Sequence, residues 1–196
     1  MCIIIYNMPN TMNRKKMGYS TLATLWEQNP HGAGYWVERE DGDVFFSKGF
    51  LNLADFLDAI RTEGLTALSR YAIHFRWASR GEVKASLCHP FMAEENGKWW
   101  QLKGLSNRVI MHNGTLSIPT GAGRSDTAEY VANRLSKMGN ICHWTAVKKI
   151  ESETVGSRML LYDKGKVRMT GGWIEKSGYY FSNVRGALVY ENQRHC

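Results

Sequence analysis

The sequence has few residues of the kinds that mark disulfide-stabilised, membrane-spanning or multidomain proteins. Its 196 residues include four cysteines and four prolines, with neither a CxxC pair nor a Pro- or Ser-rich linker. The scattered cysteines argue against a disulfide framework, and the missing linker favours one domain over residues 1–196. No apolar run approaches the ~18 residues of a membrane span, and the initial residues lack a signal-peptide pattern. We therefore expect a cytoplasmic protein with reduced thiols.

Metal and nucleotide sites are also unexpected. Cys and His are adjacent in three doublets, and neighbouring residues rarely ligate one tetrahedral metal; the doublets are Cys88–His89, Cys142–His143 and His195–Cys196. Neither GxxxxGK[ST] nor GxGxxG occurs, so we expect no cofactor and no metal. The net charge of +7 is spread along the chain rather than concentrated on one helix, which argues against a nucleic-acid partner.

The hydrophobic pattern predicts an α+β fold. Apolar residues at helical spacing predict helices at 21–28, 52–64 and 125–138, the second capped by Asn52 and the third by Asp126 with Glu129. Runs rich in β-branched and aromatic residues predict strands at 3–6, 35–39, 44–47, 71–76, 108–112, 159–162, 167–170 and 179–182. Turn signals at 41–42 and 163–165 indicate hairpins, so the sheets should be largely antiparallel with helices on their outer faces.

The chain opens MCIIIY, with a cysteine directly behind the initiator methionine. In one interpretation Met1 is retained, Cys2 is a small buried apolar residue, and Ile3 to Tyr6 form a core strand. In the other, Met1 is removed because the next side chain is small, and Cys2 then carries both a thiol and a free α-amine. This stretch alone leaves both interpretations open.

Four polar clusters lie at or just beyond the ends of predicted strands, where a sheet can hold functional side chains rigidly. They are Cys2, HFRWASRG at 74–81, HNG at 112–114 and SDT at 125–127. Singly, each has an ordinary explanation as an ion-pair partner (Arg76), a turn (Asn113 with Gly114) or a helix cap (Asp126). Together they fit the hydrolysis of an amide in a small zwitterionic substrate.

Each cluster supplies one requirement of that reaction. A thiolate attacks the carbonyl, and an N-terminal Cys2 has its own α-amine, of pKa about 7.7–8.0 in model peptides, as a nearby base. Asn113 can offer its side-chain amide, and Gly114 its backbone N–H, to the tetrahedral oxyanion. The guanidinium of Arg76 suits a substrate carboxylate, and the carboxylate of Asp126 suits a substrate ammonium.

These segments resemble a known family in both order and spacing. MC at the start, HFRWASRGEVKASLCHPF at 74–91, MHNG at 111–114 and SDTAEYV at 125–131 resemble the class II glutamine amidotransferase domain, an N-terminal nucleophile hydrolase. NPHGAGYWV at 29–37 is similar to that family's first helix-to-strand passage, so the resemblance runs from Cys2 to about Val131. GSRMLLYD at 156–163 and GGWIEKSGYYFSN at 171–183 resemble the paired closing strands of small standalone members found in phage and bacteria.

The resemblance implies a four-layer αββα sandwich of two antiparallel sheets, with the nucleophile at the start of a central strand. It implies catalytic roles for Cys2, exposed by loss of Met1, and for an oxyanion hole made by Asn113 and Gly114. It also implies a set of substrate-binding residues, which are Arg76 for the carboxylate, Asp126 for the ammonium, Trp77, Ser79 and Gly81 in or beside a loop that closes over glutamine, and His89.

The sequence departs from the family at two of these positions. Many members read Cys-Gly-Ile at the start, whereas this chain has Ile3 after Cys2. Many also carry Ala-Thr where this chain has Ala78 and Ser79, a change that keeps the hydroxyl.

Three functions follow from the resemblance. The first is a glutaminase that releases glutamate and passes ammonia to a separate partner synthetase. The second keeps the mechanism but hydrolyses another γ-glutamyl amide or peptide. The third is a catalytically silent module that binds a partner or an amino acid through the same pocket.

Overall fold

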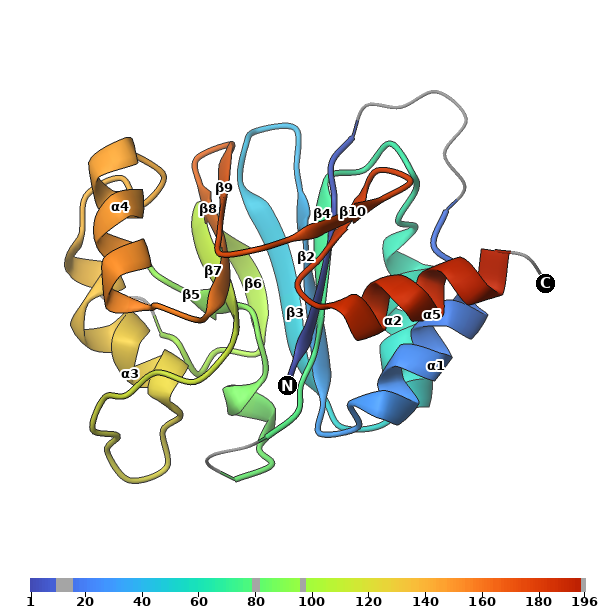
Figure 1. Ribbon diagram of the computed structural model, residues 1–196, viewed down its shortest axis with the longest axis horizontal. Coiled ribbons are helices and arrows are strands. Elements are labelled where there is room, and N and C mark those ends of the chain that lie inside the picture. Colours follow the sequence, from blue (N-terminus) through green and yellow to red (C-terminus); the bar gives the residue numbers. More distant parts are fainter. Residues whose placement is uncertain (10–15, 79–81, 96–97, 195–196) are drawn as a thin grey trace.

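The computed structural model of the chain describes residues 1–9, 16–78, 82–95 and 98–194, without the side chains of residues 193 and 194. Two antiparallel sheets lie face to face, and helices cover the outer face of each (Figure 1). The layers therefore run helix, sheet, sheet, helix, which confirms the predicted α+β class and the αββα sandwich. No helix in the described ranges is long and apolar enough to cross a membrane.

The larger sheet has seven strands in the order β10-β11-β1-β4-β2-β3-β6. Its strands are β1 (Ile3–Asn7), β2 (Ala33–Glu38), β3 (Val44–Phe50), β4 (Tyr71–Phe75), β6 (Lys103–Ser106), β10 (Ile174–Lys176) and β11 (Tyr179–Phe181). β1 is an interior strand between β11 and β4, and Ile3 at its start pairs with Phe75 at the end of β4. Cys2 directly precedes β1 and Arg76 directly follows β4, so the two residues lie next to each other at the same end of these paired strands.

The smaller sheet has four strands in the order β5-β7-β8-β9. They are β5 (Phe91–Met92), β7 (Arg108–Asn113), β8 (Arg158–Asp163) and β9 (Lys166–Thr170). The prediction that GSRMLLYD and GGWIEKSGYYFSN form paired closing strands is wrong in one respect. The first contains β8, in the smaller sheet, and the second contains β10 and β11, which pair with each other in the larger sheet.

The residues of β1 alternate between two hydrophobic cores. Ile3 and Ile5 pack in the core between the larger sheet and its helices. Ile4 and Tyr6 pack in the core between the two sheets, with Trp36 and Met111. Because successive strand residues point to opposite faces, the apolar run IIIY is that of a strand buried on both sides.

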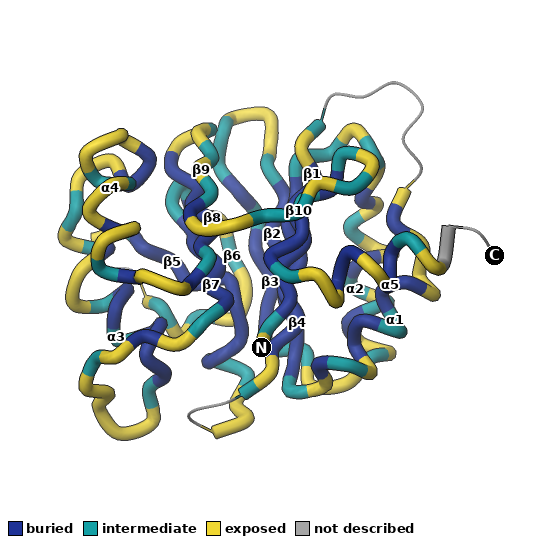
Figure 2. The backbone as a smooth tube through the Cα atoms, in the orientation of Figure 1, coloured by how far each residue is buried: buried dark blue, intermediate teal, exposed yellow. Residues whose placement is uncertain are grey.

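Five α-helices in the described residues cover the outer faces. α1 (Tyr19–Gln28), α2 (Leu53–Glu63) and α5 (Val184–Arg194) contribute to the core on the larger sheet. α3 (Asp126–Asn133) and α4 (Trp144–Glu153) contribute to the core on the smaller one. Two 3₁₀ turns, η1 (Ala85–Leu87) and η2 (Leu135–Lys137), complete the elements. Figure 2 shows buried strands at the centre and exposed residues on the outward sides of the helices.

The caps of α2 match the predicted ones, whereas the N-cap of α3 is a different residue from the predicted one. Asn52 caps α2 by accepting a hydrogen bond from the Asp55 backbone N–H at 2.9 Å, and Gly64 ends it in the left-handed conformation with φ 68°. At α3 the cap is Ser125, whose Oγ accepts from the Ala128 N–H at 3.2 Å. The predicted cap, Asp126, is instead the first residue of the helix, so that assignment was one residue too late.

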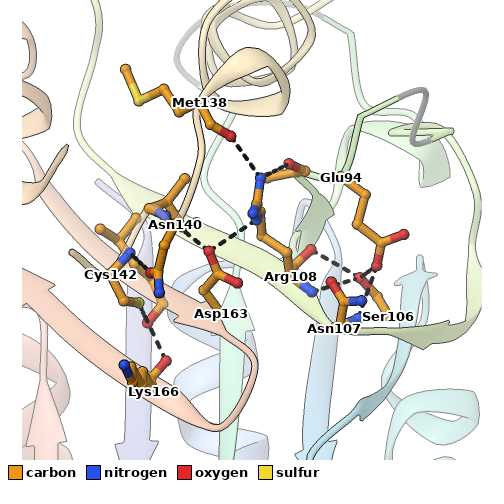
Figure 3. A network of polar contacts seen from close by, with 12 residues as sticks. Glu94, Ser106, Asn107, Arg108, Met138, Asn140, Cys142, Asp163 and Lys166 are labelled. Carbon is orange, nitrogen blue, oxygen red and sulfur yellow. Dashed lines mark hydrogen bonds and ion pairs between the residues drawn. The ribbon is translucent and has the colours of Figure 1, made fainter.

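A buried polar network holds the far end of the smaller sheet, where β7 begins (Figure 3). The Arg108 Nε lies 3.0 Å from Asp163 Oδ2, and the same carboxylate oxygen accepts the Ile141 N–H at 2.8 Å. Glu94 accepts hydrogen bonds from Ser106 Oγ and from the Asn107 N–H. These contacts join the loops at the end of β7 opposite to Asn113, so we assign them a structural role.

Candidate functional site

A small cavity lies where β1 begins, where β4 and β7 end and where α3 begins. Its volume is about 30 Å³, and its lining is formed by Cys2, Arg76, Trp77, Ala78, Leu87, His89, His112, Gly114, Ser125, Asp126 and Thr127. Six of the nine predicted site residues are in this lining, although they come from segments far apart in the sequence.

The thiol of Cys2 is held against the peptide that follows Arg76. Its Sγ accepts a hydrogen bond from the Trp77 N–H at 3.4 Å and donates to the Trp77 carbonyl at 3.6 Å. Burial raises the pKa of the Cys2 thiol, while the Trp77 hydrogen bond, the chain N-terminus and Arg76 act in the opposite direction. The net result is a thiol that stays protonated at neutral pH unless a base takes its proton.

The side chain of Arg76 is buried although it is charged. It lines the cavity, and its Nη1 donates to the Glu82 carbonyl at 2.9 Å. The hydrogen bonds from the Arg76 N–H to the Gly32 carbonyl and from the His31 N–H to the Arg76 carbonyl fix its main chain. A guanidinium held in this way beside a thiol is suited to binding a carboxylate.

The carboxylate of Asp126 is also buried and is held by two backbone N–H groups. Oδ1 accepts from Thr127 and Oδ2 from Leu116, each at 2.7 Å. These contacts bring the first turn of α3 against the segment that follows β7. Oδ1 also accepts a hydrogen bond from Thr127 Oγ1 at 3.3 Å, whereas Oδ2 keeps a lone pair that can accept one from a ligand in the cavity.

The two predicted oxyanion donors are placed differently. Gly114 lines the cavity, and a Cβ at this position would meet Ser157 Oγ at 2.2 Å and His112 Nε2 at 2.9 Å, so the close approach requires glycine. Asn113 is fully buried outside the lining, and its Nδ2 donates to Ser182 Oγ at 3.0 Å. Its amide nitrogen therefore faces the larger sheet rather than the cavity.

The remaining predicted residues divide into two pairs. Trp77 and His89 both line the cavity: Trp77 is 42% exposed, with its ring 4.8 Å from that of His31, and His89 is buried. Ser79 and Gly81 lie outside the described residues.

Three histidines lie together at the cavity, a grouping that the sequence analysis missed: His89 and His112 line it, and His74 contacts both. His89 stacks on His74 at 4.1 Å, and the Nε2 of His74 donates to the His112 carbonyl at 3.2 Å. The His112 Nδ1 lies 2.7 Å from Thr127 Oγ1. Burial lowers the pKa of His74 to about 3 and that of His112 to about 4, and it lowers the pKa of His89 as well. These imidazoles are therefore neutral at physiological pH.

Only their position next to strand ends could have indicated these histidines, since His74 and His112 stand within or beside the quoted motifs.

Within the described part of the chain, no group of three or more His, Cys, Asp or Glu side chains is arranged to hold a metal ion. The cavity therefore offers a thiol, a guanidinium, a carboxylate and neutral imidazoles, a set suited to binding a zwitterion beside a nucleophile.

Comparison with known proteins gives a likeness among solved structures. No protein-family model matches the sequence, and no curated protein matches it. Among solved structures, the chain is similar to glutamine phosphoribosylpyrophosphate (PRPP) amidotransferase from B. subtilis, solved in complex with ADP and GMP. The identity is 15% and the TM-score 0.56, with 97% of this chain and 44% of the amidotransferase covered.

That likeness concerns the fold. At this identity it shows that the two chains share a fold, which agrees with the two antiparallel sheets and their covering helices. The chain spans less than half the length of the amidotransferase to which it is similar.

Proposed function

We propose that residues 1–196 form a single class II glutamine amidotransferase-like domain that hydrolyses the side-chain amide of glutamine to glutamate and ammonia. The observation that carries this proposal is the convergence of Cys2, Arg76 and Asp126 on one cavity. A nucleophile, a cation and an anion are the groups needed to attack an amide in a zwitterionic amino acid. The similarity of fold to a glutamine PRPP amidotransferase supports this choice of chemistry.

Activation of the thiol begins with removal of Met1. Since burial raises the pKa of the Cys2 thiol, attack needs a base close to Sγ. Loss of Met1 converts the Cys2 peptide nitrogen into an α-amine, with a pKa of about 7.7–8.0 in model peptides. This amine takes the thiol proton and later returns a proton to the departing ammonia.

The reaction then proceeds through two acyl-transfer steps. The Cys2 thiolate attacks the carbonyl carbon of the side-chain amide, the C–N bond breaks with a proton delivered to nitrogen, and ammonia leaves. Water attacks the resulting γ-glutamyl thioester, the C–S bond breaks, and glutamate leaves with the thiol restored. The Gly114 N–H and the Asn113 side-chain amide stabilise the oxyanion in both steps, the latter after turning away from Ser182.

Substrate recognition uses the charged groups of the lining. Arg76 binds the α-carboxylate of glutamine and Asp126 its α-ammonium, and Trp77 and His89 enclose the rest. Because a buried water needs roughly 10–15 Å³, the cavity of about 30 Å³ has room for about two waters and not for glutamine. Binding therefore requires lining side chains to move, and Trp77 is the most exposed of them.

The proposal has consequences for partners and location. It places the chain among the members of the family found in phage and bacteria, acting in the cytoplasm. The ammonia then serves a separate synthetase, an enzyme that consumes ammonia as a substrate.

The experiment that tests the proposal is direct. Purified protein is incubated with glutamine while glutamate is measured, beside a Cys2→Ala variant and a panel of other γ-glutamyl amides and peptides. We expect release of glutamate from glutamine by the parent protein alone. Equal release of glutamate by both proteins would show that Cys2 is not the nucleophile. Faster hydrolysis of another γ-glutamyl compound would show that this compound, and not glutamine, is the substrate.

A further inference from the structure

A second and larger cavity lies beside Met1. It has a volume of about 560 Å³ and is bounded by the start of β8, the connection from β9 to β10 and the segment from β11 into α5. It shares no lining residue with the Cys2 cavity. Small-molecule sites commonly have volumes of about 300–1,000 Å³, so this cavity is of the size that holds a metabolite.

The charge of the lining has one sign. Arg158 and Arg185 both contribute, and none of the described lining residues is acidic. Arg158 is oriented by the hydrogen bond from its Nε to the Gly172 carbonyl at 3.1 Å. A planar guanidinium fixed in this way is matched to carboxylate or phosphate oxygens. Trp173 adds a partly buried aromatic wall, held by the bond from its Nε1 to the Thr170 carbonyl at 2.9 Å.

The inner wall of the cavity is the segment that holds the proposed catalytic residues. Asn183 lines the cavity, and its Nδ2 donates to the Cys2 carbonyl at 2.7 Å. Ser182 lines it too, and its Oγ accepts from the Ile4 N–H at 2.8 Å and from Asn113 Nδ2 at 3.0 Å. A molecule bound here therefore contacts the two residues that orient Cys2 and Asn113.

We propose that this cavity is a binding site for a small organic anion, a molecule that carries carboxylate or phosphate groups. The two arginines supply the charge, the volume admits a metabolite, and Ser182 and Asn183 place the ligand beside the N-terminal residue. The site is separate from the glutamine cavity, and binding to it needs no thiol. Removal of Met1, which is part of the lining, takes away an apolar residue and none of the residues that the proposal uses, so the proposal stands independently of the proposed hydrolysis.

Isothermal titration calorimetry on Cys2→Ala protein tests the site without catalysis. The probes are citrate for carboxylates, inorganic pyrophosphate for phosphates and trehalose as a neutral molecule, at constant ionic strength. We expect saturable single-site binding of one or both anions and none of trehalose. Whichever anion binds more tightly identifies the group that the site prefers.

Charge variants connect that binding to the cavity. The double variant Arg158→Gln/Arg185→Gln should weaken binding about tenfold or more, because each hydrogen bond to a charged group is typically worth about that factor. Arg185→Gln alone alters an exposed side chain and should preserve the fold, so it serves if the double variant misfolds. Arg61→Gln removes an exposed arginine on α2 and should leave binding unchanged. Absence of saturable binding, or binding that is equal in the parent and in Arg185→Gln, overturns the proposal.

Discussion

The backbone nitrogen of Trp77 lies 3.4 Å from the Sγ of Cys2, a contact between residues 75 positions apart in the sequence. It exists because β1 and β4 pair in a register that places Ile3 opposite Phe75. The position of the thiol is therefore set by the sheet and not by a loop. A shift of one residue in this pairing would turn the side chains of β1 to the opposite faces, so both cores specify the register.

Gly114→Ala should damage the site through a single added methyl group. A Cβ at Gly114 would lie 2.2 Å from Ser157 Oγ, so the backbone that presents the Gly114 N–H must shift. We expect loss of glutaminase activity and a decrease of about 1–3 kcal/mol in the free energy of unfolding. Gly139→Ala, which meets no atom within 4 Å, is the matched control. Full activity of Gly114→Ala would show that this backbone position has no catalytic role.

Arg76→Lys should affect substrate binding more than turnover. Lysine keeps the positive charge but loses the planar pair of donors that binds a carboxylate, so the KM for glutamine should rise about tenfold or more. The kcat should change much less, since Arg76 is not proposed to contact the reacting amide. Arg61→Lys, on the exposed side of α2, controls for the general effect of the substitution. An unchanged KM would remove Arg76 from the binding site.

Acid should destabilise the protein through the buried histidines His74 and His112. Burial lowers the pKa of His74 to about 3 and that of His112 to about 4, whereas an unfolded histidine titrates near 6.5. The unfolded state therefore binds more protons between pH 6.5 and 4. The contribution of the two neutral histidines to the free energy of unfolding is complete above pH 6.5 and is lost as the pH falls toward 4.

At pH 5 this loss amounts to about 2 kcal/mol for His74 alone, measured as the decrease in the free energy of urea unfolding relative to pH 7. NMR titration of the imidazole resonances provides the check. His74 and His112 should remain neutral down to pH 5 in the folded protein. Titration of both with midpoints near 6.5 would contradict this account of their burial.

Lys48 makes a contribution of the same sign in a higher pH range. Burial lowers its pKa to about 7, and the amine is held by Nζ contacts to the Ser86 carbonyl at 3.0 Å and the Trp99 carbonyl at 2.7 Å. An unfolded lysine keeps its proton to about pH 10.4, so Lys48 increases the free energy of unfolding as the pH rises above 7.

The Lys48→Met variant lacks this titration. Between pH 7 and 8.5 the free energy of unfolding of the parent should rise by about 1–2 kcal/mol relative to that of Lys48→Met. Comparing the two proteins cancels the contribution of other groups that titrate in the same range. A difference that stays constant over this range would show that Lys48 has an ordinary affinity for its proton.

Much of the fold was predictable because local signals and packing agree. α1 and α2 end at the predicted stops, with Asn29 and Gly64 as their C-caps, and the runs predicted as strands all belong to the two sheets. The prediction missed α4, α5, β5, β6 and β10. In α5, Gly186 weakens the local helix signal, yet a Cβ there would lie 2.9 Å from Ile3 Cγ2, so packing against β1 requires glycine. The third helix ends at Asn133, and η2 continues it only as a 3₁₀ turn.

The candidate site was predictable to the extent that short motifs at strand ends indicate chemistry. The structure brings Cys2, Arg76, Gly114 and Asp126 to one cavity, a convergence that the motifs alone could not show, and the roles of these residues stay predictions. The direction of the Asn113 amide was not predictable, because it depends on Ser182, which lies 69 residues away. Nor could the sequence indicate that His74, His89 and His112 lie together at the cavity. That grouping depends on how the two sheets face each other.

The central claim is that Cys2 becomes the N-terminal residue and acts as the nucleophile. Its most direct test is mass analysis of the N-terminal peptide before and after treatment with a glutamine-mimicking electrophile. We predict a peptide that begins at Cys2 and carries the label there, while Cys88 and Cys142, which are buried, stay unlabelled. A peptide that retains Met1, or a label confined to other cysteines, would contradict the account.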